Sequence, residues 1–286
     1  MISDSSLCEK RPLVALVTTP IGNFEDITYR AVSFLKEADV IACEDTRETL
    51  KLLKHYQIEP KKLISLYAQT ESRDSKDLVR EVKEKNLILA YCSDAGMPGI
   101  SDPGALLVKE ARAQDVPVTV LPGPSASLSA LVISGIDTAD FSFYGFLPTK
   151  EGAVKKTLLS LSNRKETIIF YESPKRIRKT LFLMKEVFGE ERTVSISREL
   201  TKMYEQSITG SLGEICDYEF EERGEFVIIV APSGIEEETD PEEINSFIKE
   251  KLSSGMKSKD VVSAVVDRYS VSKNDAYRMV LDCKSE

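Results

Sequence analysis

The fold is decided by a stretch that reads LILAY at residues 87–91 and, after Cys92, SDAGMPGISDPG at residues 93–104. The first part is short and continuously apolar, which is typical of a parallel strand covered on both faces. The second part is rich in glycine, which lets a ligand approach the backbone, and in proline, which fixes the shape of a loop. Open α/β sheets bind ligands beyond the carboxyl ends of their strands. The stretch therefore predicts an α/β sheet with a binding loop at a strand end.

Short apolar runs alternate with amphipathic segments around this stretch. The other predicted strands lie at residues 13–17, 40–43, 63–66 and 118–121, with helices predicted at residues 27–37 and 74–85. This alternation is typical of an α/β domain with a parallel sheet. Two prolines and a glycine at residues 122–124 interrupt it. We place a boundary there and assign a first α/β domain to residues 1–121.

A second set of apolar runs follows this boundary. Strands are predicted at residues 141–144, 167–171, 193–197 and 225–230. Apolar and polar residues alternate more visibly in these runs, which indicates antiparallel or mixed pairing. We assign a second α/β domain to residues 122–234.

The remaining residues, 235–286, are predicted to form a small helical extension. Asp240 and Pro241 are typical of a helix start, and further helices are predicted at residues 257–268 and 273–283, the last with Ser272 and Asp275 at capping-box spacing. The sequence leaves open whether this extension contacts RNA or only packs as a cap.

The composition argues against several kinds of site. The five cysteines of the 286-residue chain are scattered without a CxxC pair, so we expect reduced core thiols rather than disulfides or a zinc site. The single histidine, His55, stands among polar residues and is expected at the surface, which argues against a histidine nucleophile system or a multi-histidine metal site. Neither GxxxxGK[ST] nor GxGxxG occurs. We predict no metal.

Nothing in the sequence predicts a membrane partner. No apolar run approaches the ~18 residues that a spanning helix needs. Residues 1–6 (MISDSS) lack the basic start and the long apolar run of a signal peptide. The expected location is the cytoplasm.

Basic side chains gather in one part of an otherwise acidic chain. The net charge is −9, yet residues 150–180 contain nine lysines and arginines against three acids. Such a concentration can form a phosphate-facing patch, although a solvated helix face would give the same composition. Ser173 and Pro174 are interpreted as an N-cap and first-turn proline, so the cations after them lie against the preference of the helix dipole. That placement favours an anionic partner.

Four loops at strand ends are predicted to share a pocket. Besides residues 93–104, they are residues 18–23 (TTPIGN), 44–47 (EDTR) and 122–125 (PGPS). Asp102 with Pro103 has the structural alternative of capping the next helix. Asp94 has no such duty and could hold a ribose hydroxyl or a cationic group.

These motifs resemble the tetrapyrrole methylase superfamily, in particular its branch that methylates small-subunit ribosomal RNA. The resemblance is carried by TPIGN at residues 19–23, EDTR at 44–47, SDAGMPGISDPG at 93–104, LPGPS at 121–125 and FYESP at 170–174. It covers roughly residues 12–232, and the helical extension also resembles that branch. Tetrapyrrole enzymes have a more glycine-rich first loop, so TPIGN favours the ribosomal RNA branch.

The resemblance implies a homodimer of two-domain subunits, with S-adenosyl-L-methionine in a cleft between the α/β domains. It implies methyl transfer to the ribose 2′-hydroxyl of a cytidine in 16S rRNA, at the decoding centre of the small ribosomal subunit. The cofactor-binding residues implied by the motifs are Pro20, Gly22, Asp94, Ala95, Gly96, Ile100, Ser125, Ala126, Tyr171 and Glu172. The cations expected to bind RNA are Lys150, Lys175, Arg176, Arg178 and Lys179.

The acceptor side is assigned to Glu44, Asp45 and Arg47 as a hypothesis. With histidine excluded, the base that removes the 2′-hydroxyl proton must be a carboxylate, a neutral lysine or a water held by one of them. Arg47 could bind an RNA phosphate bidentately. The structural alternative is that Thr46 or Asp45 caps the next helix and Arg47 pairs with a neighbouring acid.

Two other functions are compatible with the same sequence. One is a methylase that acts on a small molecule or a protein, such as a corrin precursor or the diphthine intermediate. The basic stretch and the helical extension argue against it, since neither helps a small acceptor. The other is a ribosome-assembly binding protein that has kept the fold and lost catalysis.

Overall fold

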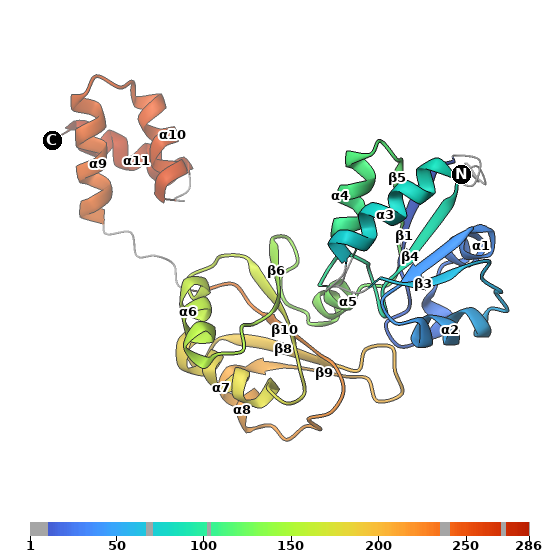
Figure 1. Ribbon diagram of the computed structural model, residues 1–286. Helices are drawn as coiled ribbons and strands as arrows, with labels where there is room; N and C mark the ends of the chain where they lie inside the picture. The colour runs from blue at the N-terminus through green and yellow to red at the C-terminus, as the bar shows by residue number, and fades with distance from the viewer. Residues whose placement is uncertain (1–10, 67–70, 102–103, 235–240, 270–272, 286) are drawn as a thin grey trace. The chain divides into compact units, whose positions relative to one another are not determined.

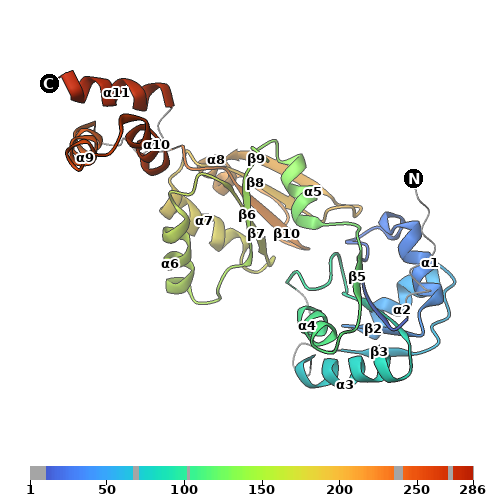
Figure 2. The same ribbon diagram turned by 90° about the horizontal axis from the view of Figure 1, so that it is seen from above.

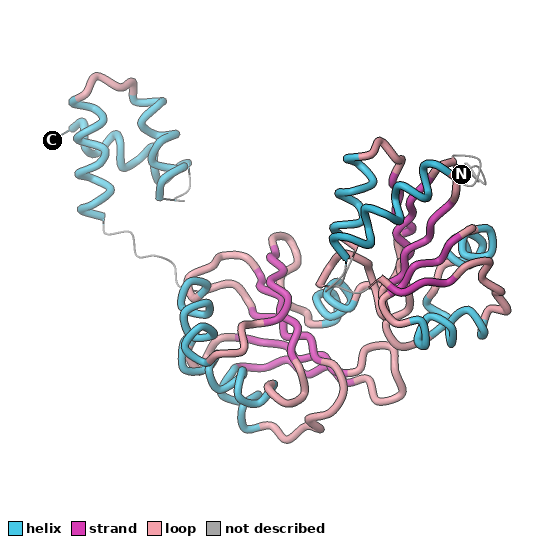
Figure 3. Tube along the Cα trace, in the orientation of Figure 1, coloured by secondary structure: helices cyan, strands magenta, loops and turns pink. Residues whose placement is uncertain are grey.

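The computed structural model describes residues 11–66, 71–101, 104–234, 241–269 and 273–285. The chain divides into two compact units, Met1–Pro232 and Ser233–Glu286. The first unit contains two five-stranded sheets and the second is helical (Figures 1 and 3). The predicted class, α/β with a C-terminal helical extension, is confirmed.

The first sheet is entirely parallel, as predicted. Its order is β3-β2-β4-β1-β5, formed by β1 (Leu13–Val17), β2 (Val40–Cys43), β3 (Leu63–Ser65), β4 (Ile88–Cys92) and β5 (Val118–Leu121). All five were predicted from their apolar runs. Because every strand runs the same way, the loops that follow β1, β2, β4 and β5 emerge at one edge of the sheet.

Helices cover both faces of this sheet (Figure 2). α1 (Tyr29–Glu37) and α2 (Thr46–His55) pack on one face, while α3 (Glu71–Glu84) and α4 (Ala105–Ala113) pack on the other. A short 3-10 turn, η2 (Phe24–Asp26), precedes α1. Alternate strand residues face opposite sides, so Ala90 joins the core under α1 and α2 while Tyr91 joins the core under α3 and α4.

The second sheet is mixed, as its alternating pattern predicted. Its order is β6-β7-β10-β8-β9, formed by β6 (Phe141–Phe146), β7 (Thr167–Glu172), β8 (Thr193–Arg198), β9 (Gln206–Ser211) and β10 (Phe226–Val230). Only β6 and β7 pair in parallel. One face is covered by α6 (Glu151–Leu161), α7 (Ile177–Phe188) and α8 (Leu212–Asp217). The other face packs against Ala130 and Leu131 of α5 (Ala126–Ile133).

The second unit contains three helices with a core of their own. They are α9 (Pro241–Ser253), α10 (Ser258–Tyr269) and α11 (Lys273–Ser285). α9 begins at Pro241, where a helix start was predicted, and α10 and α11 agree with the predicted helices to within two residues. Ile248, Val265 and Ala276 are among the residues buried between them. The predicted caps Asp240 and Ser272 lie outside the described residues.

The described cysteines are thiols in or beside the cores, as expected. Cys43 and Cys92 face each other in register on β2 and β4, and both are fully buried. Cys216 is buried in the second sheet's core, and Cys283 is half-buried in the helical unit. His55 is at the surface, as expected, and contacts the rings of Phe24 and Tyr56.

Candidate active site

A cavity of about 780 Å³ in the first unit is lined by residues from both sheets. That volume lies in the range of about 300–1,000 Å³ typical of ligand pockets. From the loops of the first sheet come Ile21, Ala95, Gly96, Met97, Ile100, Ser101, Pro122 and Gly123. The segments after β5 contribute the start of α5 with the residue before it, Phe143 and Phe146 of β6, Tyr171 and Glu172 of β7, Ser173, Pro174, Leu200 and residues 224–227.

Most of the residues predicted to bind the cofactor line this cavity. They are Ala95, Gly96, Ile100, Ser125, Ala126, Tyr171 and Glu172, whereas Pro20, Gly22 and Asp94 are not part of the lining. The structure therefore brings three of the four expected loops together around one space, whereas no residue of the loop at 44–47 is part of the lining. Which ligand these residues bind stays a prediction.

The loops that follow β1 and β4 form one continuous wall of the cavity. Thr19 and Gly96 exchange backbone hydrogen bonds in both directions, at 3.0 and 3.1 Å. The hydroxyl of Thr19 also donates to the carbonyl oxygen of Ser93 at 3.1 Å. Gly96 has a φ of +77°, a left-handed conformation that favours glycine. These bonds fix the wall before any ligand arrives.

Gly22 serves a close approach between the two halves of the first unit. A Cβ atom placed on it would lie 2.4 Å from Cγ of Lys202 and 3.0 Å from the carbonyl oxygen of Leu200. Leu200 lines the cavity. Gly22 thus lets the loop after β1 pack closely against the segment that contains Leu200 and Lys202. Its role is structural, because Gly22 itself is not part of the cavity lining.

Glu172 lines the cavity, but its carboxylate is held from within the protein. Oε1 accepts hydrogen bonds from the backbone of Ser173 at 2.7 Å and from Nε of Arg176 at 2.9 Å, and Oε2 accepts from the hydroxyl of Thr180 at 2.7 Å. The Glu172 side chain is 0% exposed. The structure therefore gives this carboxylate an anchoring role at the cavity wall.

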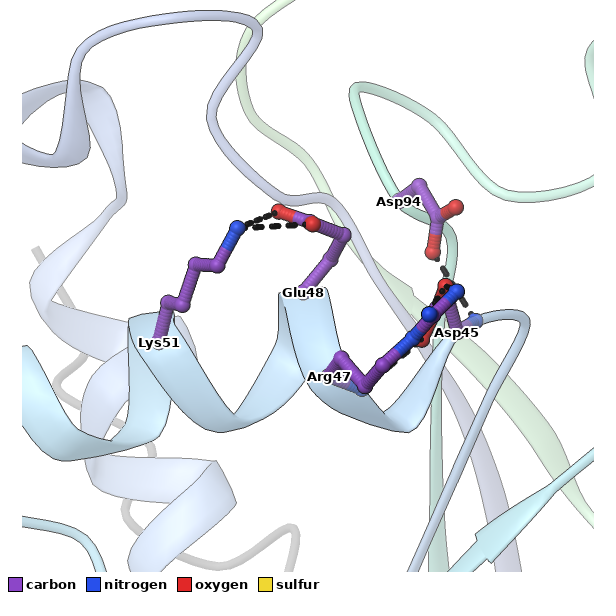
Figure 4. A network of polar contacts seen from close by, with 5 residues as sticks. All are labelled: Asp45, Arg47, Glu48, Lys51 and Asp94. Carbon is purple, nitrogen blue, oxygen red and sulfur yellow. Dashed lines mark hydrogen bonds and ion pairs between the residues drawn. The ribbon is translucent and has the colours of Figure 1, made fainter.

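Asp45 is the N-cap of α2, the structural alternative considered for it (Figure 4). Its Oδ1 accepts from the backbone N–H of Arg47 at 2.8 Å, and its Oδ2 accepts from the Arg47 guanidinium at 2.6 Å. Asp94 joins the two loops, because its Oδ1 accepts from the backbone N–H of Asp45 at 3.0 Å. None of Glu44, Asp45 and Arg47 lines the cavity, although Ala95, next to Asp94, does.

The carboxylates at these strand ends differ in their pKa values. Hydrogen bonds from the side chain and backbone of Arg47 lower the pKa of Asp45 to about 2. Burial, followed by the charges of Asp94 and Asp45, raises the pKa of Glu44. Burial and the charge of Asp45 also raise the pKa of Asp94. Glu44 therefore holds a proton more readily than an exposed glutamate does.

The basic stretch is partly neutralised within the protein. Lys179 pairs with Glu151 at 2.8 Å. Arg178 pairs with Glu222 at 3.0 Å and lies 4.2 Å from the ring centroid of Phe220. By contrast, Lys150 and Lys175 are exposed and have no ion pair or hydrogen bond from their side chains to any described residue.

One expectation about this stretch is corrected. Ser173 does not cap α7, because the helix begins at Ile177 with Arg176 as its N-cap. The RNA contact expected of Arg176 stays a prediction, and its guanidinium is held within the protein. It donates to Glu172 and to the carbonyl oxygens of Leu147 and Pro148, at 3.2 and 3.0 Å. The carboxylate four residues earlier on the chain is the partner that draws this arginine inward.

Some expectations concern absences or undescribed residues. Asp102 and Pro103 lie outside the described residues. Within the described ranges, no group of three or more His, Cys, Asp or Glu side chains is arranged to hold a metal ion. Across the same ranges, none of the helices is long and apolar enough to cross a membrane.

Comparison with known proteins places this fold and its loops in a family. Residues 13–216 match the profile described as Tetrapyrrole (Corrin/Porphyrin) Methylases. Ribosomal RNA small subunit methyltransferase I of Bacillus subtilis (strain 168) is 42% identical over 275 residues, which cover 93% of this chain and 92% of that protein. The chain belongs to the tetrapyrrole methylases, in the branch of ribosomal RNA small subunit methyltransferase I. Family membership makes it a methyltransferase that depends on S-adenosylmethionine, as predicted.

A second relative and the solved structures agree with this placement. Ribosomal RNA small subunit methyltransferase I of Halalkalibacterium halodurans is 41% identical, covering 92% of this chain and 93% of the relative. Diphthine synthase aligns with a TM-score of 0.59 at 14% identity, covering 77% of this chain and 90% of its own. The methyltransferase CobJ aligns with a TM-score of 0.58 at 18% identity, covering 77% and 94%. These two structures support the tetrapyrrole methylase fold alone.

Several lining residues of this tetrapyrrole methylase were not predicted. Phe143 and Phe146 of β6 and Leu200 line the cavity. Phe146 pairs in register with Tyr171 of β7. The alternation of aromatic residues along β6 was the signal available in the sequence. Only the pairing of β6 with β7 shows that these aromatic residues lie beside the FYESP motif.

Proposed function

We propose that this chain methylates the ribose 2′-hydroxyl of a cytidine in 16S rRNA, at the decoding centre of the small ribosomal subunit. The observation that carries the proposal is the 42% identity to a ribosomal RNA small subunit methyltransferase I over 93% of the chain. The cavity, lined by residues of four of the five motifs, supports it. Ribosomal subunits are its substrate, so we place the protein in the cytoplasm. The described cysteines, none in a disulfide, fit that compartment.

The cavity is the proposed site of the methyl donor. Its size suits a nucleoside-bearing ligand, and its lining combines apolar side chains such as Ile21 and Ile100 with a few polar groups, including Ser101. The raised pKa of Asp94, which is next to the lining residue Ala95, also fits, because a positively charged ligand nearby would stabilise its ionised form. When bound there, S-adenosylmethionine supplies an electrophilic methyl group.

Alignment of the acceptor is the main task left to the protein. A well-oriented encounter lowers a barrier by roughly 7–11 kcal/mol. The backbone hydrogen bonds between Thr19 and Gly96 fix this wall of the cavity before a ligand binds. Binding therefore requires little further ordering of the protein. The proton of the 2′-hydroxyl must also be removed, and we assign this step to Glu44. Asp45 and Arg47 position the loop beside it, since each is held by the other.

Lys150 and Lys175 are proposed to bind RNA phosphates, because their side chains are exposed and have no ion-pair partner among the described residues. The double substitution Lys150→Gln with Lys175→Gln is expected to weaken binding of small subunits. It should also reduce the slope of log Kd against log salt by about 1.5, the effect of losing two phosphate contacts. Filter binding between low and moderate salt measures both.

A matched control replaces two exposed lysines elsewhere, Lys36→Gln with Lys109→Gln on α1 and α4. The net charge changes equally, but the salt slope should stay that of the unmodified protein. Equal slopes for the two double variants would remove Lys150 and Lys175 from the RNA contact.

A second copy of this chain is proposed to cover the outer face of α5. This helix, ASLSALVI, is apolar almost all round, which is typical of a helix buried on every side. Ala130 and Leu131 pack on the second sheet, whereas Val132 is 72% exposed and Ile133 is also exposed. Covering this face in a homodimer removes apolar surface from water.

Val132→Asp is therefore expected to convert a dimer to a monomer in analytical ultracentrifugation. The control is Leu159→Asp, which changes an apolar side chain on α6 that is 62% exposed and should leave the dimer intact. A Val132→Asp protein that still sediments as a dimer would place the interface elsewhere.

The activity itself is tested by incubating labelled S-adenosylmethionine with small subunits that lack the modification, then mapping the labelled nucleotide. We expect the label on a cytidine ribose in the decoding centre. Label only on a small molecule or protein acceptor would favour the alternative methylases. Binding of the donor and of subunits without transfer would favour an assembly factor that has lost catalysis.

A further inference from the structure

Phe146, at the carboxyl end of β6, leaves a large aromatic side chain exposed at the cavity. It is 57% exposed although it lines the cavity wall. Its ring packs against Tyr171 at a centroid distance of 5.7 Å and an interplanar angle of 64°. Phe143 packs against another side of Tyr171 at 4.9 Å. An apolar ring that stays uncovered at a binding site is available to stack on a ligand.

The position of Phe146 is fixed by hydrogen bonds immediately after it in the chain. Leu147 and Pro148 both accept hydrogen bonds from the guanidinium of Arg176, which is itself anchored on the buried Glu172. The backbone of β6 is further held by its register with β7, where Phe146 lies opposite Tyr171. The ring is therefore carried by a rigid strand end, as a precise contact requires.

Cations flank this strand end. Lys150 follows Phe146 by four residues, at the N-cap position of α6. Lys175 is adjacent to Arg176, whose side chain reaches the backbone after Phe146. Both lysines are exposed. Exposed positive charge beside an uncovered aromatic ring is the combination that binds single-stranded nucleic acid, since the charges contact phosphates while the ring stacks on a base.

We propose that Phe146 is the stacking platform for the unpaired base of the acceptor nucleotide. The inference rests on the proposed function. The 2′-oxygen must reach the methyl donor inside the cavity, so the base attached to the same ribose lies at the cavity wall. Sequence-specific recognition of RNA typically splays such bases out of their stack and places them on aromatic side chains. Phe146 offers that surface next to the cations that hold the backbone.

The test compares Phe146→Ala and Phe146→Leu with Phe141→Ala. Phe141 begins the same strand and is 44% exposed, but it does not line the cavity. The Kd for unmodified small subunits, the Kd for S-adenosylmethionine, and KM and kcat for methyl transfer are measured for each. Phe146→Leu keeps apolar bulk without an aromatic face, and Phe146→Tyr keeps the face.

Phe146→Ala and Phe146→Leu are expected to raise Kd and KM for subunits by about 5- to 150-fold, the effect of removing one stacked base. Their Kd for S-adenosylmethionine should stay within about twofold of the unmodified protein. Phe146→Tyr should recover most of the subunit affinity because it keeps an aromatic face, whereas Phe141→Ala should behave like the unmodified protein in every measurement.

Three results would overturn the inference. One is unchanged subunit binding by Phe146→Ala. The second is an equal loss of donor affinity, which would place the ring against the donor instead. The third is a shift from dimer to monomer in the same variant, which would place it in a subunit interface. If the unmodified protein itself transfers no methyl group to subunits, the proposed function is wrong, and this inference, which depends on it, is wrong as well.

Discussion

Arg176→Met is expected to lower the free energy of unfolding by about 3–5 kcal/mol, the cost of leaving a buried charge without its partner. Arg176 is 27% exposed, whereas the Glu172 side chain it pairs with is 0% exposed. Methionine keeps the apolar stem of arginine and removes only the charge and the donors. Urea unfolding followed by circular dichroism measures the effect.

Lys175→Met provides the matched control, because it makes the same change in charge one residue earlier. Lys175 is exposed, so its substitution should stay within about 0.5 kcal/mol of the unmodified protein. Adding Glu172→Gln to Arg176→Met should recover part of the loss, since the amide no longer leaves a charge buried. Equal stabilities for Arg176→Met and Lys175→Met would contradict an anchoring role.

Glu44→Gln is expected to reduce kcat for methyl transfer by about 10²- to 10⁴-fold, the range for loss of a general base. Glutamine preserves the shape of the side chain but accepts no proton. The Kd for S-adenosylmethionine should be almost unchanged, because Glu44 does not line the cavity. Single-turnover assays on unmodified subunits separate the chemical step from binding.

The control is Glu48→Gln on the neighbouring helix α2. Glu48 is exposed and pairs with Lys51 at 2.7 Å, so its loss should leave kcat within a factor of about two, as for other surface substitutions. A Glu44→Gln protein with the kcat of the Glu48→Gln control would assign the base elsewhere.

The pH dependence of kcat is a second test of Glu44 as the general base. Glu44 acts as a base only when it is ionised, so kcat should rise with pH and level off above its pKa. Burial and the charges of Asp94 and Asp45 raise that pKa, so the plateau begins at a higher pH than an exposed glutamate would give. The residual kcat of Glu44→Gln should not show this rise with pH.

The first sheet could be predicted almost completely from the sequence. Its three central strands, β2, β4 and β1, are covered on both faces and are almost continuously apolar, and the edge strands β3 and β5 are mostly apolar although partly exposed. β9, Gln206–Ser211, was not predicted because it is an edge strand of mostly polar residues, QSITGS, none of them fully buried. Its place depends on pairing with β8, which is a long-range contact that local pattern does not contain.

The candidate site was predicted in outline, whereas the roles of its charged residues depend on the fold. The motifs located most of the cavity lining, since loops at the ends of parallel strands meet at one edge. For Asp45 the sequence could not decide between two roles, because a helix cap and a catalytic carboxylate have the same sequence signal. For Arg176, the helical i,i+4 rule does not apply to Glu172, because Glu172 ends β7 and Arg176 precedes α7, so only the fold shows this pair. For Phe146, the alternation of aromatic residues along β6 was a signal, but only the fold shows that its ring is exposed at the cavity.

The described thiols report on three of the hydrophobic cores. Cys43 and Cys92 lie inside the first sheet, Cys216 under the second and Cys283 among the three terminal helices. An alkylating reagent modifies only a thiolate that it can reach, and burial raises the pKa of Cys43, Cys92 and Cys216. The order in which mass spectrometry finds these cysteines labelled therefore records the order in which the three cores come apart.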